Sequence, residues 1–223
     1  MDLEAEFGPI DIYLFDQLLR GQIAPGMRVL DAGCGPGRNL VYLLRSGYDV
    51  FAVDSEPVAV AAVRKLAASL APALPADHMR QEQIEHMTFA DASFDVVLSS
   101  AVLHFARDDA QFEAMLTEMW RVLKPGGLFF ARLASSIGME SRMRRVSGRR
   151  FTLPDQSERY LVDEARLIEL TRALGGVLVD PLKTTIVQDQ RCMTTWVMRK
   201  RATPAVSPPD PRAPPGGTGA TPR

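Results

Sequence analysis

Short apolar runs alternate with segments of helical periodicity along most of this 223-residue chain. Apolar runs predict strands at residues 27–30, 48–53, 94–99 and 128–133. Helices are predicted between them, at residues 38–46, 56–70 and from Asp108 or Asp109 to Leu123. Strands that alternate with helices of this length form a mostly parallel sheet covered on both faces. Ligands of such sheets bind beyond the carboxyl ends of the strands, so the loops there are the places to search.

The C-terminal part of the pattern changes from alternation to a hairpin. A helix is predicted over 163–174, ending at Gly175. Two apolar runs follow at 177–187 and 191–199, separated by three polar residues. They predict an antiparallel hairpin that closes a doubly wound α/β sheet.

The loop after the first strand carries glycines at alternate positions, Gly33, Gly35 and Gly37. Glycine lets the backbone turn tightly and approach a ligand without a Cβ atom in the way. A helix that begins near Arg38 would present free N–H groups, which favour an anionic group such as a carboxylate. A tight strand-to-helix turn without a ligand remains the alternative.

Asp54 stands at the end of the second predicted strand, where a carboxylate can accept hydrogen bonds from vicinal ribose hydroxyls. Its alternative role is that of an acid at a helix N-terminus. The dinucleotide fingerprint G-x-G-x-x-G is broken, because Arg38 occupies the position of its third glycine. A nicotinamide-dependent oxidoreductase is therefore disfavoured.

The segment D-A-G-C-G-P-G at residues 31–37 resembles the first motif of class I S-adenosylmethionine-dependent methyltransferases. Later motifs of that family follow in order at residues 53–54, 94–99 and 121–127, so the resemblance covers roughly residues 25–135. It implies a Rossmann-like, doubly wound, mostly parallel seven-stranded sheet with an antiparallel C-terminal hairpin strand. Residues 37–43 bear a weaker similarity to bacterial tellurite and thiopurine-type small-molecule members.

The resemblance assigns S-adenosylmethionine contacts to eight residues: Asp31, Gly33, Gly35, Gly37, Asp54, Gln83, Ile84 and Ser99. Asp31 would lie near the amino end of the methionine moiety, and the glycines would form a wall along it. Gln83 stands where relatives often carry an aspartate that binds adenine, and the backbone N–H of Ile84 would also face adenine. An amide oxygen can accept the same hydrogen bond; in another register Glu82 or Glu85 would take this role.

Candidate acceptor contacts lie after the fourth and fifth strands. His104 could act as a base, contact the acceptor, or simply be packed at the mouth of the sheet. The irregular residues 135–160 are expected to form a lid, in which some of the arginines and Tyr160 would select an anionic or aromatic small molecule. Its arginines are Arg142, Arg144, Arg145, Arg149, Arg150 and Arg159. A solvated basic loop is the alternative.

Charge and composition argue against several classes of protein: those that bind nucleic acid, membranes or metals, and secreted proteins. The formal net charge of −1 does not favour nucleic acid or an anionic membrane as a partner. No run of about 18 apolar residues predicts a membrane span. The acidic N-terminus lacks the order of a signal peptide, and two cysteines indicate a reduced, cytoplasmic protein. The three histidines and two cysteines stand apart, so no metal site is predicted.

The sequence thus predicts a methyltransferase that moves the methyl group of S-adenosylmethionine to a small-molecule acceptor by in-line displacement. A non-catalytic S-adenosylmethionine-binding sensor of the same fold is the alternative. The methyltransferase domain is expected at residues 1–201. Residues 202–223 hold seven of the 16 prolines and are predicted to form a disordered tail.

Removal of residues 202–223 should leave the melting temperature and cofactor affinity nearly unchanged, because this composition has too few apolar side chains to pack on the domain. Differential scanning calorimetry of the shortened chain checks this. A melting temperature several degrees lower would show that the tail docks on the domain.

Overall fold

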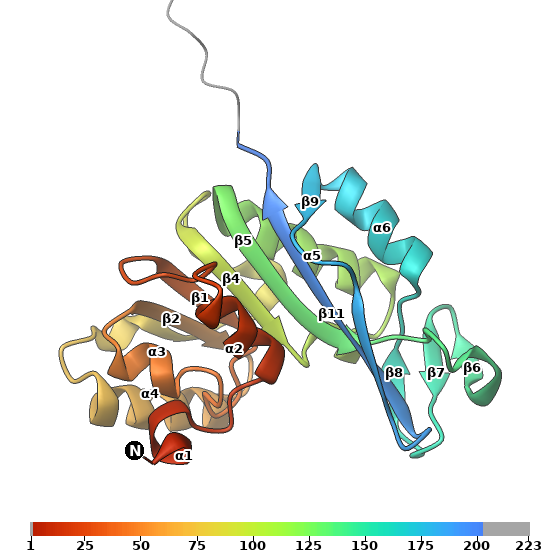
Figure 1. Cartoon of the computed structure of the whole chain (residues 1–223), viewed down its shortest axis with the longest axis horizontal. Helices are drawn as coiled ribbons and strands as arrows, with labels where there is room; N and C mark the ends of the chain where they lie inside the picture. Colours follow the sequence, from red (N-terminus) through yellow and green to blue (C-terminus); the bar gives the residue numbers. More distant parts are fainter. Residues whose placement is uncertain (1, 203–223) are drawn as a thin grey trace, which may run out of the picture.

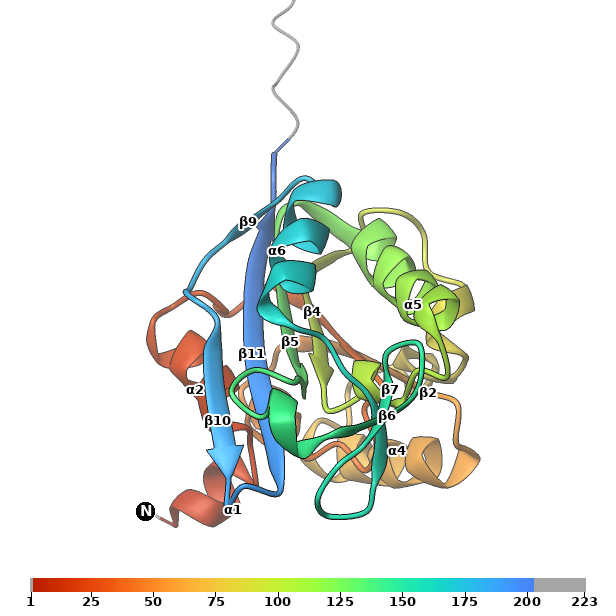
Figure 2. The ribbon, with the colours of Figure 1, turned by 90° about the vertical axis from the view of Figure 1, so that its right-hand side faces the viewer.

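The computed structural model describes residues 2–202 (Figure 1). The predicted tail lies, apart from Ala202, outside the described residues. The remaining chain folds around one mixed sheet with helices on both faces (Figure 2).

The apolar runs predicted four parallel strands, which are β1 (Arg28–Ala32), β2 (Asp49–Asp54), β4 (Phe94–Ser100) and β5 (Leu123–Ala134). A fifth parallel strand, β3 (Met79–Gln81), lies at the edge of the sheet beside β2 and was not predicted. β11 (Arg191–Lys200) runs antiparallel to β5. The order β10-β11-β5-β4-β1-β2-β3 confirms the predicted Rossmann-like, mostly parallel fold with an antiparallel strand.

The first run of the predicted hairpin is divided into two strands, β9 (Gly176–Leu178) and β10 (Lys183–Val187). Both pair with β11, so the sheet has eight strands. Pro181 lies in the interruption and has no N–H to donate. Asp180 beside it is buried and accepts a hydrogen bond from Arg20 at 2.7 Å.

Helices cover both faces of the sheet (Figure 2). One face packs against α2 (Ile12–Leu19), α3 (Val41–Arg45) and α4 (Pro57–Leu70). The other packs against α5 (Asp109–Val122) and α6 (Glu164–Ala173). Alternate residues of each strand face the two layers, which explains why the central strands are apolar throughout.

Short elements complete the fold, and the sequence pattern did not predict them. They are α1 (Leu3–Phe7), η1 (Ala76–His78), η2 (Ile84–His86), η3 (Leu103–Phe105) and η4 (Glu140–Arg142). The helix predicted from residue 38 begins only at Val41. A turn precedes it, closed by the hydrogen bond from Leu40 N to Gly37 O at 2.9 Å. The helix therefore begins three residues later than predicted.

The predicted lid segment contains a small antiparallel sheet of β6 (Arg144–Ser147), β7 (Arg150–Thr152) and β8 (Glu158–Tyr160). It lies beyond the end of β5 (Figure 1). Tyr160 fixes it to α5, because its ring stacks on Phe112 at 4.7 Å and its hydroxyl donates to Asp109 at 2.7 Å. With 1% of its surface exposed, Tyr160 is an anchor, and its expected role in selecting the acceptor was wrong.

Tyr160→Phe should lower the free energy of unfolding by about 1.5–3 kcal/mol, the value of a hydrogen bond to a charged group. Tyr160→Ala should lower it by about 3–5 kcal/mol because it also leaves a cavity against Phe112. Urea denaturation followed by circular dichroism checks both. Unchanged midpoints in both variants would contradict the anchoring role.

Candidate active site

A cavity of about 520 Å³ opens where β1, β2 and β4 end at their carboxyl edge. It is lined by Gly33, Gly35, Asp54, Ser55, Glu56, Gln83, Ile84, Glu85, Ala101, Val102, Phe105, Gln111 and Met115. Five residues of the predicted cofactor site therefore meet in one place: Gly33, Gly35, Asp54, Gln83 and Ile84.

The glycine loop is held against the neighbouring strand by backbone and side-chain hydrogen bonds. The N–H groups of Gly33 and Cys34 donate to Val53 O at 2.8 and 3.0 Å. Gly33 has φ +82°, and a Cβ atom there would come within 2.5 Å of Val102 Cγ2. No other residue fits this position without moving the chain. A Cβ atom at Gly35 would meet nothing, so that part of the loop leaves open space.

Asp54 connects three elements of the site. Its Oδ2 accepts a hydrogen bond from Gly35 N at 2.8 Å, and its Oδ1 accepts one from Glu56 N at 3.0 Å. A carboxylate has about four lone-pair sites, so each oxygen retains acceptor capacity. The side chain therefore orders the loop and can still accept hydroxyl donors from a ligand in the cavity.

Gly37 serves packing and does not form part of the cavity wall. It is buried at φ +84°, and a Cβ atom would lie 2.9 Å from Leu66 Cδ2 and 3.0 Å from Val63 Cγ2. The third glycine of the motif lets α4 approach the loop. Gly37 is not among the lining residues, so its expected place in the wall along the cofactor stays a prediction.

Ser99 also lies away from the cavity. It is fully buried within β4, opposite Ala131 of β5, and its Oγ has no hydrogen-bond partner. Ala101 and Val102, just beyond the strand, form the wall instead. The chain reaches the cavity two residues after Ser99, and the expected contact of Ser99 with the cofactor stays a prediction.

Asp31 is 2% exposed at the end of β1. The pKa of its carboxyl is raised to about 7, mainly by burial. The positive charge of Arg38 opposes this rise, and the negative charge of Asp54 adds to it. A buried carboxyl of this kind becomes a stable anion when a cation is placed beside it. Asp31 is not among the residues that line the cavity, so its expected contact with the ammonium group stays a prediction.

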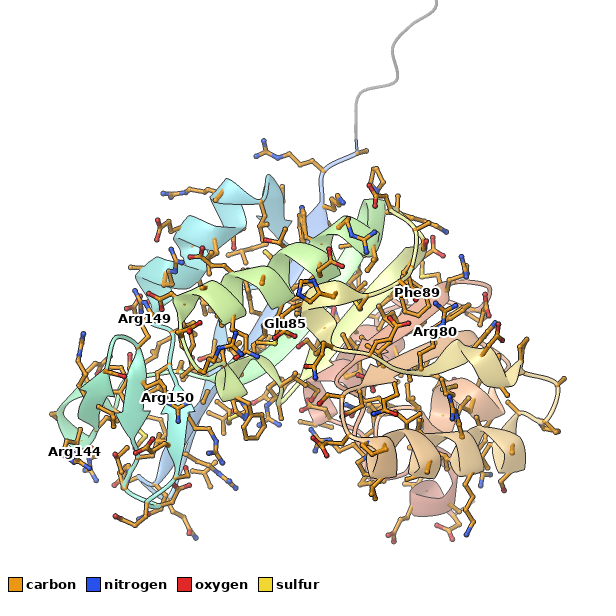
Figure 3. All side chains as sticks on the ribbon, turned by 180° about the vertical axis from the view of Figure 1, so that it is seen from behind. Arg80, Glu85, Phe89, Arg144, Arg149 and Arg150 are labelled. Atoms are coloured by element: carbon orange, nitrogen blue, oxygen red, sulfur yellow. The ribbon has the colours of Figure 1, made fainter. Side chains whose placement is uncertain are left out.

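The segment around η2 lines the far side of the cavity. The side chain of Gln83 is exposed, and that of Ile84 is buried. Glu85, labelled in Figure 3, also lines the cavity and accepts a hydrogen bond from Gln111 Nε2 at 2.6 Å. Glu82 instead accepts from Thr88 N at 2.9 Å and is absent from the lining. Glu85 is thus the carboxylate of this segment that reaches the ligand space.

A second cavity of about 330 Å³ adjoins the first, and Ala101 and Phe105 line both. Ala101 has φ +64°, a backbone conformation that residues other than glycine rarely adopt. Its N–H donates to Arg132 O at 2.7 Å, which holds the strained turn against β5. The second cavity is further lined by Arg38, His104, Arg132, Ala134, Leu153, Asp155, Ser157, Arg159, Val187, Arg191 and Met193.

His104 lines the second cavity with 5% of its surface exposed. Its Nδ1 accepts a hydrogen bond from Ala134 N at 3.2 Å, which assigns the ring proton to Nε2. Burial, reinforced by the charges of Arg159 and Arg191, lowers the pKa of His104 to about 4. A neutral ring with Nε2–H donates a hydrogen bond. Of the two functional roles considered, the geometry favours an acceptor contact over a base.

Most arginines of the predicted lid are directed elsewhere. Arg149 pairs with Asp163 at 3.0 Å and Arg150 pairs with Glu158 at 3.1 Å. Arg144 is exposed at the outer edge of the small sheet (Figure 3). Of the lid arginines, Arg159 alone lines the second cavity. The sequence did not indicate Arg38, Arg132 and Arg191, because three separate segments bring them together.

The sequence predicted neither a metal site nor a membrane-spanning helix, and both points can be examined over the described residues. Between residues 2 and 202, no group of three His, Cys, Asp or Glu side chains is arranged to hold a metal ion. Within the same range, every helix is too short or too polar to cross a membrane. The predicted cytoplasmic location stays a prediction.

The fold and the glycine-loop cavity define a Rossmann-like α/β protein, and comparisons with known proteins identify its family. Residues 30–131 match the family model described as a methyltransferase domain. The ubiquinone biosynthesis O-methyltransferase of Methylocella silvestris is 32% identical over 183 residues, covering 74% of this chain and 68% of that protein. The uncharacterized methyltransferase YodH of Bacillus subtilis is 36% identical over 122 residues, covering 55% of this chain and 46% of that protein.

A solved structure shows the same fold. The 1,6-didemethyltoxoflavin-N1-methyltransferase of Burkholderia thailandensis, with bound S-adenosylhomocysteine, has a TM-score of 0.65 and 24% identity, covering 90% of this chain and 81% of that one. The chain belongs to the class I S-adenosylmethionine-dependent methyltransferase family. It spans about half the length of the first curated relatives that it matches.

Asp54→Ala should weaken binding of S-adenosylhomocysteine by about 1.5–3 kcal/mol, because it removes a charged acceptor from the cavity. Isothermal titration calorimetry checks this, with Asp77→Ala, an exposed acid outside the cavity, as the matched control. Unchanged affinity in a folded Asp54→Ala variant would remove Asp54 from the site.

Proposed function

We propose that this protein transfers the methyl group of S-adenosylmethionine to a small-molecule acceptor by in-line displacement. The cofactor would occupy the first cavity and the acceptor the second. One observation carries the proposal: the two cavities meet at Ala101 and Phe105. Methyl transfer needs the donor and acceptor sites to be in direct contact at such a junction.

The residues of the first cavity fit the cofactor. Asp54 would hold the ribose hydroxyls, while the open side of Gly35 leaves room for the methionine moiety. Asp31, buried at the end of β1 and outside the lining, would hold the ammonium group, as the family resemblance implies. Gln83 and the backbone of Ile84 would face the adenine, with Glu85 as a further acceptor. The cavity volume of about 520 Å³ lies within the range of roughly 300–1,000 Å³ that is usual for cofactor sites.

The protein's contribution to such a reaction is mainly positioning. When bound, S-adenosylmethionine supplies a methyl group already activated by the sulfonium. Holding two reactants in line can lower the barrier by about 7–11 kcal/mol. His104 would orient the acceptor by donating from Nε2. The small sheet would cover the acceptor, since Ser157 and Arg159 lie in the cavity wall.

A small acceptor is supported by the size of the second cavity, about 330 Å³. It is also supported by the Burkholderia thailandensis enzyme of the same fold, whose acceptor is the small molecule 1,6-didemethyltoxoflavin. Among the curated relatives, the malonyl-[acyl-carrier protein] O-methyltransferase of Enterobacter lignolyticus acts on a carrier-bound group. The small volume of the second cavity favours a free small molecule for this chain.

The competing function is that of an S-adenosylmethionine-binding protein without catalysis. The second cavity argues against it, because a sensor has no need of an acceptor site beside the cofactor. Release of S-adenosylhomocysteine from S-adenosylmethionine, measured with a fractionated cell metabolite extract, tests the proposal. We expect release above the extract-free background. Tight cofactor binding with no release in any fraction would favour the sensor.

Affinity for S-adenosylhomocysteine should depend on pH through Asp31. The pKa of about 7 means that the carboxyl is increasingly protonated in the free protein below that pH. Binding an ammonium group requires the ionised form, so affinity should rise between about pH 5 and 7, by up to tenfold per pH unit, and then level off. Calorimetric titration across this range checks the slope, and Asp31→Asn should abolish it.

The stability of the free protein should show the opposite trend. A carboxyl whose pKa is raised in the folded state contributes stability at low pH and loses it as pH rises towards 7. Asp31→Asn should remove this contribution as well. A wild-type affinity that is flat across the range would contradict the assignment of Asp31 to the ammonium group.

A further inference from the structure

Building on the proposed function, we propose that the second cavity selects acceptors that carry a carboxylate, and that Arg159 and Arg191 hold this group. The proposal rests on the distribution of charge in the cavity, on which of its arginines are already paired, and on the hydrogen-bonding state of His104.

Four arginines line the cavity: Arg38, Arg132, Arg159 and Arg191. Two of them are partnered within the protein. Arg132 Nη1 lies 2.8 Å from Asp11 Oδ2, an oxygen that is also 3.8 Å from Arg38 Nη2. Arg38 additionally donates to Ser100 Oγ at 3.0 Å. Asp11 therefore partly neutralises this side of the cavity.

Arg159 and Arg191 differ from that pair. Among the residues that the structure describes, neither guanidinium lies within 4.0 Å of a carboxylate oxygen. Arg159 Nη1 donates to the backbone oxygen of Glu158 at 2.7 Å, and its guanidinium stacks over Phe105 at 4.8 Å. A guanidinium has five N–H donors, so most of those on Arg159 remain for a ligand.

One carboxylate does line this cavity, and its own contacts reduce its effect. Asp155 accepts hydrogen bonds from Ser157 N at 2.9 Å and Ser157 Oγ at 2.5 Å. These bonds hold the pKa of Asp155 below its usual value, and the charges of Arg159 and Arg191 act in the same direction. The anion thus offsets part of the positive field without forming an ion pair with either arginine.

His104 adds a donor of its own. Because Nδ1 is occupied by Ala134 N, the ring presents Nε2–H. Burial keeps the pKa of this histidine low, and the charges of Arg159 and Arg191 act in the same direction. Two guanidinium groups and one N–H group complement a carboxylate, which only accepts hydrogen bonds.

The remaining wall is apolar and small. Phe105, Leu153, Val187 and Met193 line it, so the body of the acceptor is expected to be apolar. Phe105 is 60% exposed and lies at the junction with the first cavity. A small organic acid satisfies both the charge and the apolar surface.

The test measures binding of organic acids to the protein saturated with S-adenosylhomocysteine. The probes are benzoate, phenylacetate, 3-phenylpropionate and succinate, each paired with its uncharged amide, and isothermal titration calorimetry gives the affinities. We expect at least one acid to bind about tenfold or more tightly than its amide, the ratio that one charge-assisted hydrogen bond provides. Arg159→Gln with Arg191→Gln should abolish that preference.

Arg144→Gln with Arg172→Gln is the matched control, because both arginines are exposed and lie outside the two cavities. The control should retain the preference for acids, and both double variants should bind S-adenosylhomocysteine as the wild type does. A wild-type protein that binds no acid more tightly than its amide overturns the proposal, as does a preference that survives in Arg159→Gln with Arg191→Gln. Failure of the wild type to bind S-adenosylhomocysteine would instead overturn the proposed function.

Discussion

The hydrogen bond from the Gly35 N–H to the Asp54 carboxylate, at 2.8 Å, is the contact on which the site depends. It joins the loop after β1 to the end of β2, so that Gly35 and Asp54 together line the first cavity. The backbone bonds from Gly33 and Cys34 to Val53 reinforce the same connection. Without this contact the loop would lose one of the three hydrogen bonds that hold it against β2, the one at Gly35 in the wall of the first cavity.

The two cavities differ in charge, and this difference organises the proposed reaction. The first contains the acids Asp54, Glu56 and Glu85, with Asp31 buried nearby, which suits a cationic cofactor. The second is lined by four arginines, which suits an anion. Arg38 links the two, because it lines the second cavity and opposes the rise in the pKa of Asp31.

Much of the fold could be predicted, because buried parallel strands read as apolar runs whatever their neighbours are. The prediction missed short elements and the exact ends of helices. β3 has three residues and carries too short a pattern to recognise, and α3 begins at Val41 because a turn replaces its first residues. The site was predictable where it follows from strand ends, as at Asp54.

The site was not predictable where the same residue type occurs for two different structural reasons. Gly33 avoids Val102 at the cavity, whereas Gly37 avoids Leu66 and Val63 on α4, yet the sequence shows the same residue at both. The arginines of the second cavity come from the glycine loop, β5, β8 and β11, and only the folded chain brings them together.

The central claim is that cofactor and acceptor occupy two cavities that meet at Ala101 and Phe105. A crystal structure of the protein with S-adenosylhomocysteine tests it most directly. We expect the ribose hydroxyls to bind the Asp54 carboxylate and the sulfur atom to face the junction with the second cavity. A ligand bound elsewhere, or one whose sulfur atom faces away from that junction, would contradict the account.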